Sequence, residues 1–413
     1  MTNGTTPTIR PIAGQEFPEF YRTLADAFGN DVHEVDRSAD RTVFEPERSL
    51  AAFEQETVVA TAAAFTRELT LPGRSVPVAA VTMVGVAPTH RRQGLLTALM
   101  RRQLTDLFEN QHEPVAALWA SEAPIYGRFG YGLAARHAVL TGHTRRMALR
   151  PGTDLGSTRM RQVTVAEVPM LVGDLWDRLR RHRVGWLNRP GRWWEYQTAD
   201  PEHRRGGAGA LRAVVCAQAD GEIAGYCLYR IRADWRPSGP HHQVEVRELA
   251  AATATAYAAV WSFLLGLDLV RQIRAPYRPL DEPLQHLVSD ARSVELSLGD
   301  NLWVRTVDVG RALSARCYAR EVDVVFDVVD EFCPWNTGRW RLTGGPQGAE
   351  CHRTVDPADL ALTSTELGAA LLGGTSLPVL AAAGRVRELR RGAVAVVGGA
   401  FGTDRAPWCP EVF

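Results

Sequence analysis

The sequence predicts an α/β protein (in layered terms, α+β) of about three domains, in which two successive regions share one order of strands and helices. A chain of 413 residues is longer than one hydrophobic core usually serves. Residues 76–87 form an apolar run that stops at a proline, continues into a basic loop with a glycine and opens into an amphipathic helix. Residues 244–267 repeat this strand-then-helix order more weakly. We therefore expect domains over residues 1–145, 146–292 and 293–413.

The first region predicts the order strand, helix, three strands, helix, strand, helix and strand. These elements are expected over residues 8–12, 15–28, 50–54, 57–71, 76–87, 96–108, 115–120, from 124 onward, and 131–144. The helix after the basic loop repeats its apolar side chains at spacings of three and four: Leu96, Leu99, Met100, Leu104, Leu107 and Phe108. Gly85, inside its strand, indicates a bulge or a close backbone approach.

The later regions carry weaker patterns. In the second region we expect a helix over 163–179, strands over 212–217, 222–232 and 244–250, and a helix over 254–267. Its turn at residues 250–255 has neither glycine nor arginine, so it offers a phosphate no flexible, basic cradle. An unrelated α/β domain is the alternative. The third region begins near Ser293 and includes the run 302–309. After it we expect strands over 322–329 and near 340–342, and helices over 364–372 and 377–383, a pattern that resembles sterol carrier protein domains.

Composition excludes several classes of function. Forty-seven basic residues balance forty-seven acidic ones, which argues against a nucleic-acid binder. Six cysteines lie far apart and no histidine cluster accompanies them, so we expect no metal and no disulfide framework. The dipeptide His241-His242 reads as a loop. Glycines and a proline interrupt the longest apolar tract, residues 367–384, so no membrane span is expected. Residues 1–8 lack a signal pattern, and we expect a cytoplasmic protein.

The basic loop predicts a phosphate site. A helix N-terminus presents unpaired backbone N–H groups and a positive partial charge. Gly94 lets a phosphate approach the backbone, and Arg91 and Arg92 add charge. An ordinary strand–turn–helix with surface arginines is the alternative. Residues 84–96, which read VGVAPTHRRQGLL, resemble the acyl-CoA pyrophosphate loop of the GNAT acetyltransferases, although the final small residue of that pattern is absent.

With three regions in place, the chain resembles the Eis family of actinobacterial N-acetyltransferases over essentially its full length. The resemblance depends on residues 84–96, on residues 120–132 (ASEAPIYGRFGYG) and on residues 302–308 (LWVRTVD). It implies a catalytic GNAT domain, a second, degenerate GNAT-like domain and a sterol-carrier-like domain whose C-terminus completes the active site. It also implies a homo-hexamer that acetylates amines, notably aminoglycosides, with acetyl-CoA as co-substrate.

The resemblance also suggests residue roles. Tyr126 would be the general acid that protonates the departing thiolate, and the α-carboxylate of Phe413 would be the base. The expected acetyl-CoA site comprises Val84, Gly85, Val86, Arg91, Arg92, Gln93, Gly94, Leu95, Leu96, Thr97 and Ser121. Asp26 and Glu411 would bind the cationic acceptor, and Asp31, Glu34 and Asp36 would lie in a loop at its mouth.

Other readings remain open at this point. Tyr126 could simply pack at a helix end, and the chain terminus could be frayed and without function. The acceptor could be a protein lysine, a polyamine or an endogenous metabolite. A different class of function is a lipid-binding or scaffolding protein whose working part is the third domain.

Overall fold

The computed structural model describes residues 7–413, so the terminal stretch in which no signal pattern was expected lies largely outside it. The chain forms two compact units. The first comprises the chain up to Ala135 together with Asp300–Pro407 and Val412–Phe413, and the second comprises Arg136–Gly299 and Trp408–Glu411. Among the described residues, no helix is long and apolar enough to cross a membrane.

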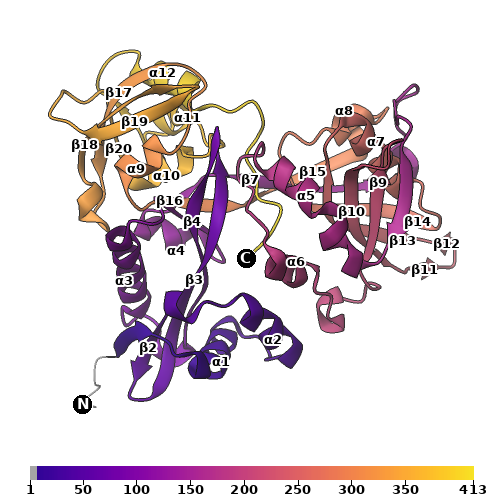
Figure 1. Cartoon of the computed structure of the whole chain (residues 1–413), viewed down its shortest axis with the longest axis horizontal. Coiled ribbons are helices and arrows are strands. Elements are labelled where there is room, and N and C mark those ends of the chain that lie inside the picture. The colour runs from indigo at the N-terminus through magenta and orange to yellow at the C-terminus, as the bar shows by residue number, and fades with distance from the viewer. Residues whose placement is uncertain (1–6) are drawn as a thin grey trace. The chain divides into compact units, whose positions relative to one another are not determined.

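The first unit is built on a seven-stranded sheet of order β1-β2-β3-β4-β5-β16-β6. Its strands are β1 (Thr8–Pro11), β2 (Ser49–Glu54), β3 (Thr57–Leu71), β4 (Arg74–Val86), β5 (Val115–Trp119), β6 (Gly132–Leu133) and β16 (Leu302–Thr306). Two long helices, α1 (Phe17–Phe28) and α3 (Leu95–Asn110), pack on opposite sides of this sheet (Figure 1). The short helices α2 (Glu34–Val43) and α4 (Ala123–Tyr126) complete this part. The predicted strands and helices of the first region are therefore confirmed up to α4.

The strand expected over residues 131–144 is wrong as a single element. It is two strands in two sheets, β6 in the first unit and β7 (Arg136–His143) in the second. The backbone N–H groups of Ala134 and Ala135 both donate to the carbonyl of Leu302, at 2.9 and 3.1 Å, and this ends the pairing of β6. The run at 302–309, which was expected to open the third region, instead begins with β16, a strand that pairs with β5 and β6 of the first sheet.

The second unit holds a matching seven-stranded sheet of order β15-β7-β14-β13-β10-β9-β8. Besides β7, its strands are β8 (Arg159–Val163), β9 (Arg212–Ala217), β10 (Ile223–Arg232), β13 (His242–Ala251), β14 (Val270–Arg278) and β15 (Val294–Asp300), with a small ribbon of β11 (Trp235–Arg236) and β12 (Gly239–Pro240). The helices are α5 (Val168–Arg180), α6 (Gly191–Thr198), α7 (Ala254–Leu265) and α8 (Leu284–Leu287). α5 and α7 contribute to separate apolar clusters on the sheet.

Two expectations for this unit need correction, and some of its elements were not predicted. The helix predicted over 163–179 begins at Val168, because Val163 ends β8 and a capping box of Thr164 and Glu167 precedes the helix. His242 is not in a loop; it opens β13 and is buried, and its Nδ1 accepts a hydrogen bond from the Asp234 N–H at 3.0 Å. The strand β14 and the helix α6 were not predicted.

The remainder of the first unit is a five-stranded sheet of order β19-β18-β17-β20-β21, with four helices. The elements are α9 (Val309–Ser314), β17 (Val322–Val329), β18 (Gly338–Gly345), β19 (Gly348–Arg353), β20 (Leu360–Thr363), α10 (Ser364–Ala370), α11 (Leu377–Ala382), β21 (Arg387–Glu388) and α12 (Ala393–Phe401). A fully buried arginine, Arg316, donates to the carbonyls of Ala370, Leu371 and Phe401 and so joins two helix ends.

Candidate functional site

The strand β4 separates from its neighbour β5 partway along its length. The two strands are parallel and pair only where Val78–Ala80 lie beside Val115–Ala117. From Val81 onward β4 pairs with β3 alone among the described strands. Backbone groups on the free edge, which includes residues 84–86, can therefore pair with an added extended chain.

A bulge lies in β4 just before this edge, next to the glycine that predicted it. Thr61 and Ala63 of β3 face Gly85 and Thr82, so two residues of β4 oppose one of β3. Met83 has a φ of 51° there, and its carbonyl accepts a hydrogen bond from the Thr61 hydroxyl at 2.8 Å. A Cβ on Gly85 would lie 2.9 Å from the Ala27 Cβ of α1. Both alternatives predicted for Gly85, a local bulge and a close approach, are confirmed.

The loop after β4 delivers an uncapped helix N-terminus. Gly94 is the N-cap of α3, with a φ of 85° that favours glycine and no side chain to satisfy the first-turn N–H groups. A Cβ added there would meet no atom within 4 Å, so the approach to these N–H groups is open. Residues 91–94 are exposed. The geometry fits an anionic phosphate group.

The two arginines of this loop differ in the contacts that they already make. Arg91 donates from Nη2 to the carbonyl of Ala27 at 2.8 Å and so binds the last turn of α1. Arg92 has a φ of 62°, in the left-handed region, and is exposed. Gln93 donates to the carbonyl of Thr89 at 3.4 Å, which holds the loop closed on itself. Arg92 is therefore the loop cation that a ligand can recruit at the smallest cost in existing contacts.

Tyr126 ends α4 and is buried in the apolar cluster beneath α3. Its side chain is 6% exposed, and its ring lies edge-on to Tyr131 with centroids 6.0 Å apart. Burial raises the pKa of Tyr126 to about 12; a hydrogen bond with the exposed Ser121 side chain acts in the opposite direction, and the charge of Glu122 adds to the rise. The phenol is therefore protonated at neutral pH, and its hydrogen-bond partner Ser121 is exposed.

A buried cation that sequence reasoning missed lies behind these tyrosines. Arg305 on β16 is fully buried and donates from Nη2 to Asp330 at 2.5 Å. Gly130 has a φ of 81°, and a Cβ there would lie 2.8 Å from the Arg305 guanidinium carbon. The charge of Arg305 opposes the rise that burial causes in the pKa of Tyr131. Its sequence signal was a charged residue inside the apolar run 302–306.

The acidic residues predicted around the acceptor separate into three environments. Asp26 is exposed in the last turn of α1, where the negative end of the helix disfavours a carboxylate unless a cation binds. Asp31 lies in the loop, as predicted. The loop expected at Glu34 and Asp36 is wrong, because both lie in the first turn of α2, where acidic side chains complement the helix dipole, and Asp36 is buried.

The last residue of the chain is buried rather than frayed, and Val412 before it is 44% exposed. Phe413 is 9% exposed and belongs to the first unit, as does Val412. Glu411, predicted to bind the acceptor, is placed otherwise: its side chain is 1% exposed and accepts hydrogen bonds from Arg189 at 2.5 and 2.8 Å. Because this carboxylate is buried and paired with a buried arginine, it is not presented to a substrate at the surface. Arg189 carried no sequence signal.

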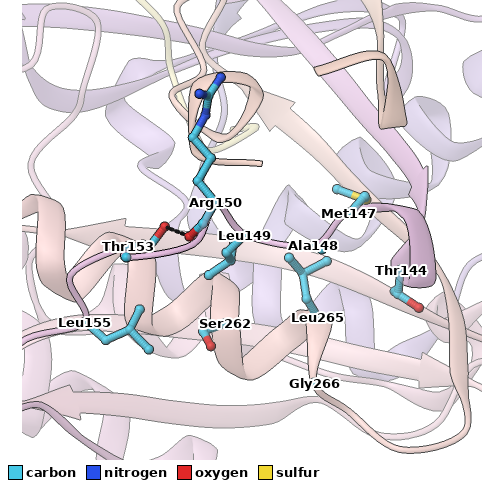
Figure 2. Close-up of a pocket in the computed structure, with 11 residues that line it drawn as sticks. Thr144, Met147, Ala148, Leu149, Arg150, Thr153, Leu155, Ser262, Leu265 and Gly266 are labelled. Atoms are coloured by element: carbon cyan, nitrogen blue, oxygen red, sulfur yellow. Dashed lines mark hydrogen bonds between the residues drawn. The ribbon is translucent and has the colours of Figure 1, made fainter. Parts of the chain in front are cut away.

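The equivalent turn of the second unit is closed to phosphate. Thr253 caps α7, and its hydroxyl accepts a hydrogen bond from the Ala256 N–H at 3.1 Å. A hollow of about 400 Å³ in this unit lies at the other end of the helix, beside Leu265 and Gly266 (Figure 2). Figure 2 shows aliphatic side chains such as Leu149 and Leu265 together with the hydroxyl-bearing Thr144, Thr153 and Ser262 and with Arg150. This hollow therefore lies away from the N-terminus of α7, the position at which the first unit has the geometry that fits a phosphate.

Comparisons with known proteins agree with this architecture. Two models of an acetyltransferase (GNAT) domain match residues 8–134 and 185–306, and a model of a sterol carrier protein domain matches residues 309–410. An uncharacterized N-acetyltransferase of Streptomyces avermitilis is 47% identical over 99% of this chain and 100% of its own length. The N-acetyltransferase Eis of Mycobacterium tuberculosis is 36% identical over 81% of both chains. The chain belongs to the Eis family of GNAT N-acetyltransferases.

A solved Eis-family structure has the same fold. Eis1 from Mycobacterium abscessus superposes with a TM-score of 0.84 at 33% identity, covering 98% of this chain and 100% of the other. The chain is therefore an acetyltransferase with two GNAT domains followed by a sterol-carrier-like domain. GNAT acetyltransferases use acetyl-CoA, and the free edge of β4 and the uncapped α3 supply groups of the kind that such a ligand needs.

Proposed function

We propose that this Eis-family enzyme transfers the acetyl group of acetyl-CoA to amino groups of aminoglycosides or similar polyamines. The observation that carries the proposal is a shared location. The free edge of β4 at Val84 and Val86, the start of α3 at Leu95 and Leu96, and the buried ring of Tyr126 all contribute to one apolar cluster. The ligand-holding and proton-donating groups thus come from elements packed together in the first unit.

We assign the holding of acetyl-CoA to the loop and the strand. The backbone N–H groups from Arg92 to Thr97 would meet the pyrophosphate, and the guanidinium of Arg92 would neutralise it. Residues 84–86 would pair with the pantetheine arm as an added strand. Ser121 would line the same site next to the Tyr126 hydroxyl.

The chemistry uses a backbone donor, an acid and a base. When the amine nitrogen attacks the thioester carbonyl, an N–H of β4 would stabilise the negative charge that develops on the oxygen. As the tetrahedral intermediate collapses, the carbon–sulfur bond breaks and Tyr126 would give its proton to the departing thiolate. The α-carboxylate of Phe413 would accept the proton that the amine loses, directly or through water. An ordinary α-carboxyl has a pKa of about 3.5, so its main task would be to hold the ammonium close.

We assign acceptor binding to Asp26, and we remove Glu411 from that role. Asp26 is exposed and lies at a helix end where a bound cation would relieve an unfavourable interaction. The family resemblance further suggests a homo-hexamer, and the sequence suggests a cytoplasmic location. We retain the domain division 1–145, 146–292 and 293–413 as part of the proposal.

The test is release of free CoA thiol from acetyl-CoA in the presence of separate acceptors. We expect fast release with kanamycin or neomycin, and slow release with a lysine peptide or a small diamine. Faster release with the peptide would move the acceptor class to protein lysines. No release with any amine, together with a lipid retained by the purified protein, would favour the carrier function of the third domain and contradict the proposal.

A further inference from the structure

The second unit holds a buried arginine between two tryptophans. The guanidinium carbon of Arg189 lies 3.7 Å from the ring centre of Trp176 and 4.4 Å from that of Trp194. Its side chain is 0% exposed. A cation in this position is stabilised by the two ring faces and needs hydrogen-bond acceptors in its own plane.

Two carboxylates accept hydrogen bonds from the guanidinium group of Arg189. Arg189 donates from Nη1 and Nη2 to Glu248 at 3.0 and 2.8 Å, and from Nε and Nη2 to Glu411 at 2.8 and 2.5 Å. The hydroxyl of Tyr226 also donates to Glu248. Glu248 thus has a second donor, and Glu411, which is almost fully buried, is paired with the cation of Arg189. A buried carboxylate without its cation is strongly disfavoured and moves to water.

The segment before Glu411 is fixed as well. The indole of Trp408 donates to the carbonyl of Tyr277 at 2.6 Å, and the Trp408 N–H donates to the carbonyl of Val184 at 3.1 Å. The thiol of Cys409 donates to the Glu411 carbonyl at 3.1 Å. Residues 408–411 are therefore anchored within the second unit, and Glu411 lies two residues before the end of the chain.

We propose that Arg189 is a positioning residue for the terminal α-carboxylate. Two residues follow Glu411, and an extended pair spans at most about 7 Å, so fixing Glu411 restricts the carboxylate of Phe413 to a small volume. Restriction of a reacting group raises the fraction of time it spends in a productive position. The inference rests on the proposed function in one respect, the role of the Phe413 carboxylate as the base. The anchoring of the tail (residues 408–413) does not depend on that role.

The anchoring is tested by digestion with carboxypeptidase, which needs no enzyme activity of the protein. Release of Phe413 and Val412 is followed by intact mass in the full chain, in Arg189→Met and in Glu411→Gln. A matched control is Arg230→Met, which removes another buried arginine of the same unit whose partner is Asp200. We expect Arg189→Met and Glu411→Gln to lose Phe413 at least about tenfold faster than the wild type and the Arg230→Met control. The reason is that the rate of cleavage follows the fraction of molecules in which the tail is detached.

Glu411→Gln keeps the shape of the side chain and leaves Arg189 paired with Glu248, so it preserves the fold if Arg189→Met does not. Equal rates of release in a folded variant and in the control would overturn the anchoring. Arg189→Lys keeps the charge but not the planar fork, and we expect intermediate protection.

The positioning role is tested by a double-mutant cycle with deletion of Phe413. In the full chain, Arg189→Met should lower kcat for the amine about 100-fold without changing the Kd of acetyl-CoA. In the deletion variant the same substitution should have no further effect, because the group that it positions is gone. Additive losses would overturn the inference. Full activity after deletion of Phe413 would instead contradict the proposed base, while the digestion result would still decide the anchoring.

Discussion

In the first GNAT domain β4 leads into α3 through an exposed loop with two arginines and a glycine N-cap, whereas in the second β13 leads into α7 through a turn that Thr253 caps. Both sheets have seven strands in a comparable order, and both carry a helix on each face. The apolar periodicity that builds the fold is thus present twice. The features that suit phosphate are present once, because they depend on a few loop residues that the fold does not require.

The two domains also differ on the other face of each sheet, opposite α3 in the first and α7 in the second. In the first unit, α1 covers the sheet with a small cluster of phenylalanines that includes Phe17 and Phe20. In the second, Trp176 of α5 packs in a cluster with Trp186 and Trp194, and the guanidinium of Arg189 lies over the rings of Trp176 and Trp194. Its two carboxylate partners are Glu248 and Glu411. The second domain therefore has a closed interior that holds residues 408–411, where the first has an exposed loop.

The largest effect should come from the tyrosine of the first domain. Tyr126→Phe removes the proposed acid and should lower kcat by roughly 10²–10⁴-fold while acetyl-CoA still binds. Tyr229→Phe, a buried tyrosine of the second domain, should leave kcat unchanged. Single-turnover kinetics of both variants provide the measurement. Equal behaviour of the two variants would break the distinction between the domains.

The pH dependence tests the same residue. Because burial raises the pKa of Tyr126 to about 12, the phenol stays protonated, and its activity as an acid is lost only as pH rises through that value. We expect no alkaline loss of kcat between pH 7 and about 10, above which a free phenol would ionise. An alkaline loss of kcat with an apparent pKa within that range, absent from Tyr126→Phe, would contradict the assignment.

The loop arginine should have the next largest effect. Arg92→Glu places a carboxylate beside the proposed pyrophosphate site and should weaken acetyl-CoA binding by about 1–3 kcal/mol. The control is Arg247→Glu on β13, an exposed arginine of the strand that leads into the closed turn. Initial-rate measurements give the KM for acetyl-CoA in each variant. An unchanged KM in folded Arg92→Glu would remove this residue from the site.

Two glycines with similar backbone conformations distinguish the effect of a substitution on stability from its effect on acetyl-CoA binding. Gly94 and Gly221 have φ of 85° and 89°, and a Cβ on either meets no atom within 4 Å. Alanine at each position should therefore cost a similar free energy of unfolding, about 1 kcal/mol. Gly94→Ala should in addition raise the KM for acetyl-CoA several-fold, because the methyl group would stand between a phosphate and the backbone. Thermal melts measure the change in stability, and initial rates measure the KM for acetyl-CoA. An equal KM for the two variants would contradict the proposal that a phosphate approaches the backbone closely at Gly94.

The smallest effect concerns the cap of the second domain. Thr253→Gly removes the hydroxyl that accepts from Ala256 and should cost a few tenths of a kcal/mol of stability. It should create no second acetyl-CoA site, because the turn still lacks arginine. Equilibrium dialysis with labelled acetyl-CoA is the measurement. A gain of bound ligand would show that the cap alone closes the second domain.

The sequence predicted the fold wherever an element carries its own periodicity. β3, β9 and β17 match their expected ranges, and α3 has the expected apolar face. The prediction was wrong where the pairing of residues far apart in the chain decides which sheet a strand joins. Nothing in residues 131–144 marks the point at which the chain leaves one sheet for another, and residues 302–306 are an apolar run that could join any sheet.

The candidate site was predictable where a motif carries it and not where tertiary contacts create it. Residues 84–97 and Tyr126 follow from local pattern and family resemblance. The helix α2 has too few apolar residues to reveal its period, so Glu34 and Asp36 were placed in a loop. The pairing of Glu411 with Arg189 joins positions 222 residues apart, and no local signal reports it.

The most direct test of the account is the number of acetyl-CoA molecules bound by one chain, measured by isothermal titration calorimetry on the full protein. We expect one molecule per chain, with the affinity strongly reduced by Arg92→Glu and unchanged by Arg247→Glu. Two molecules per chain, or one whose affinity falls only in the Arg247→Glu variant, would contradict the claim that the first GNAT domain alone holds the acetyl donor.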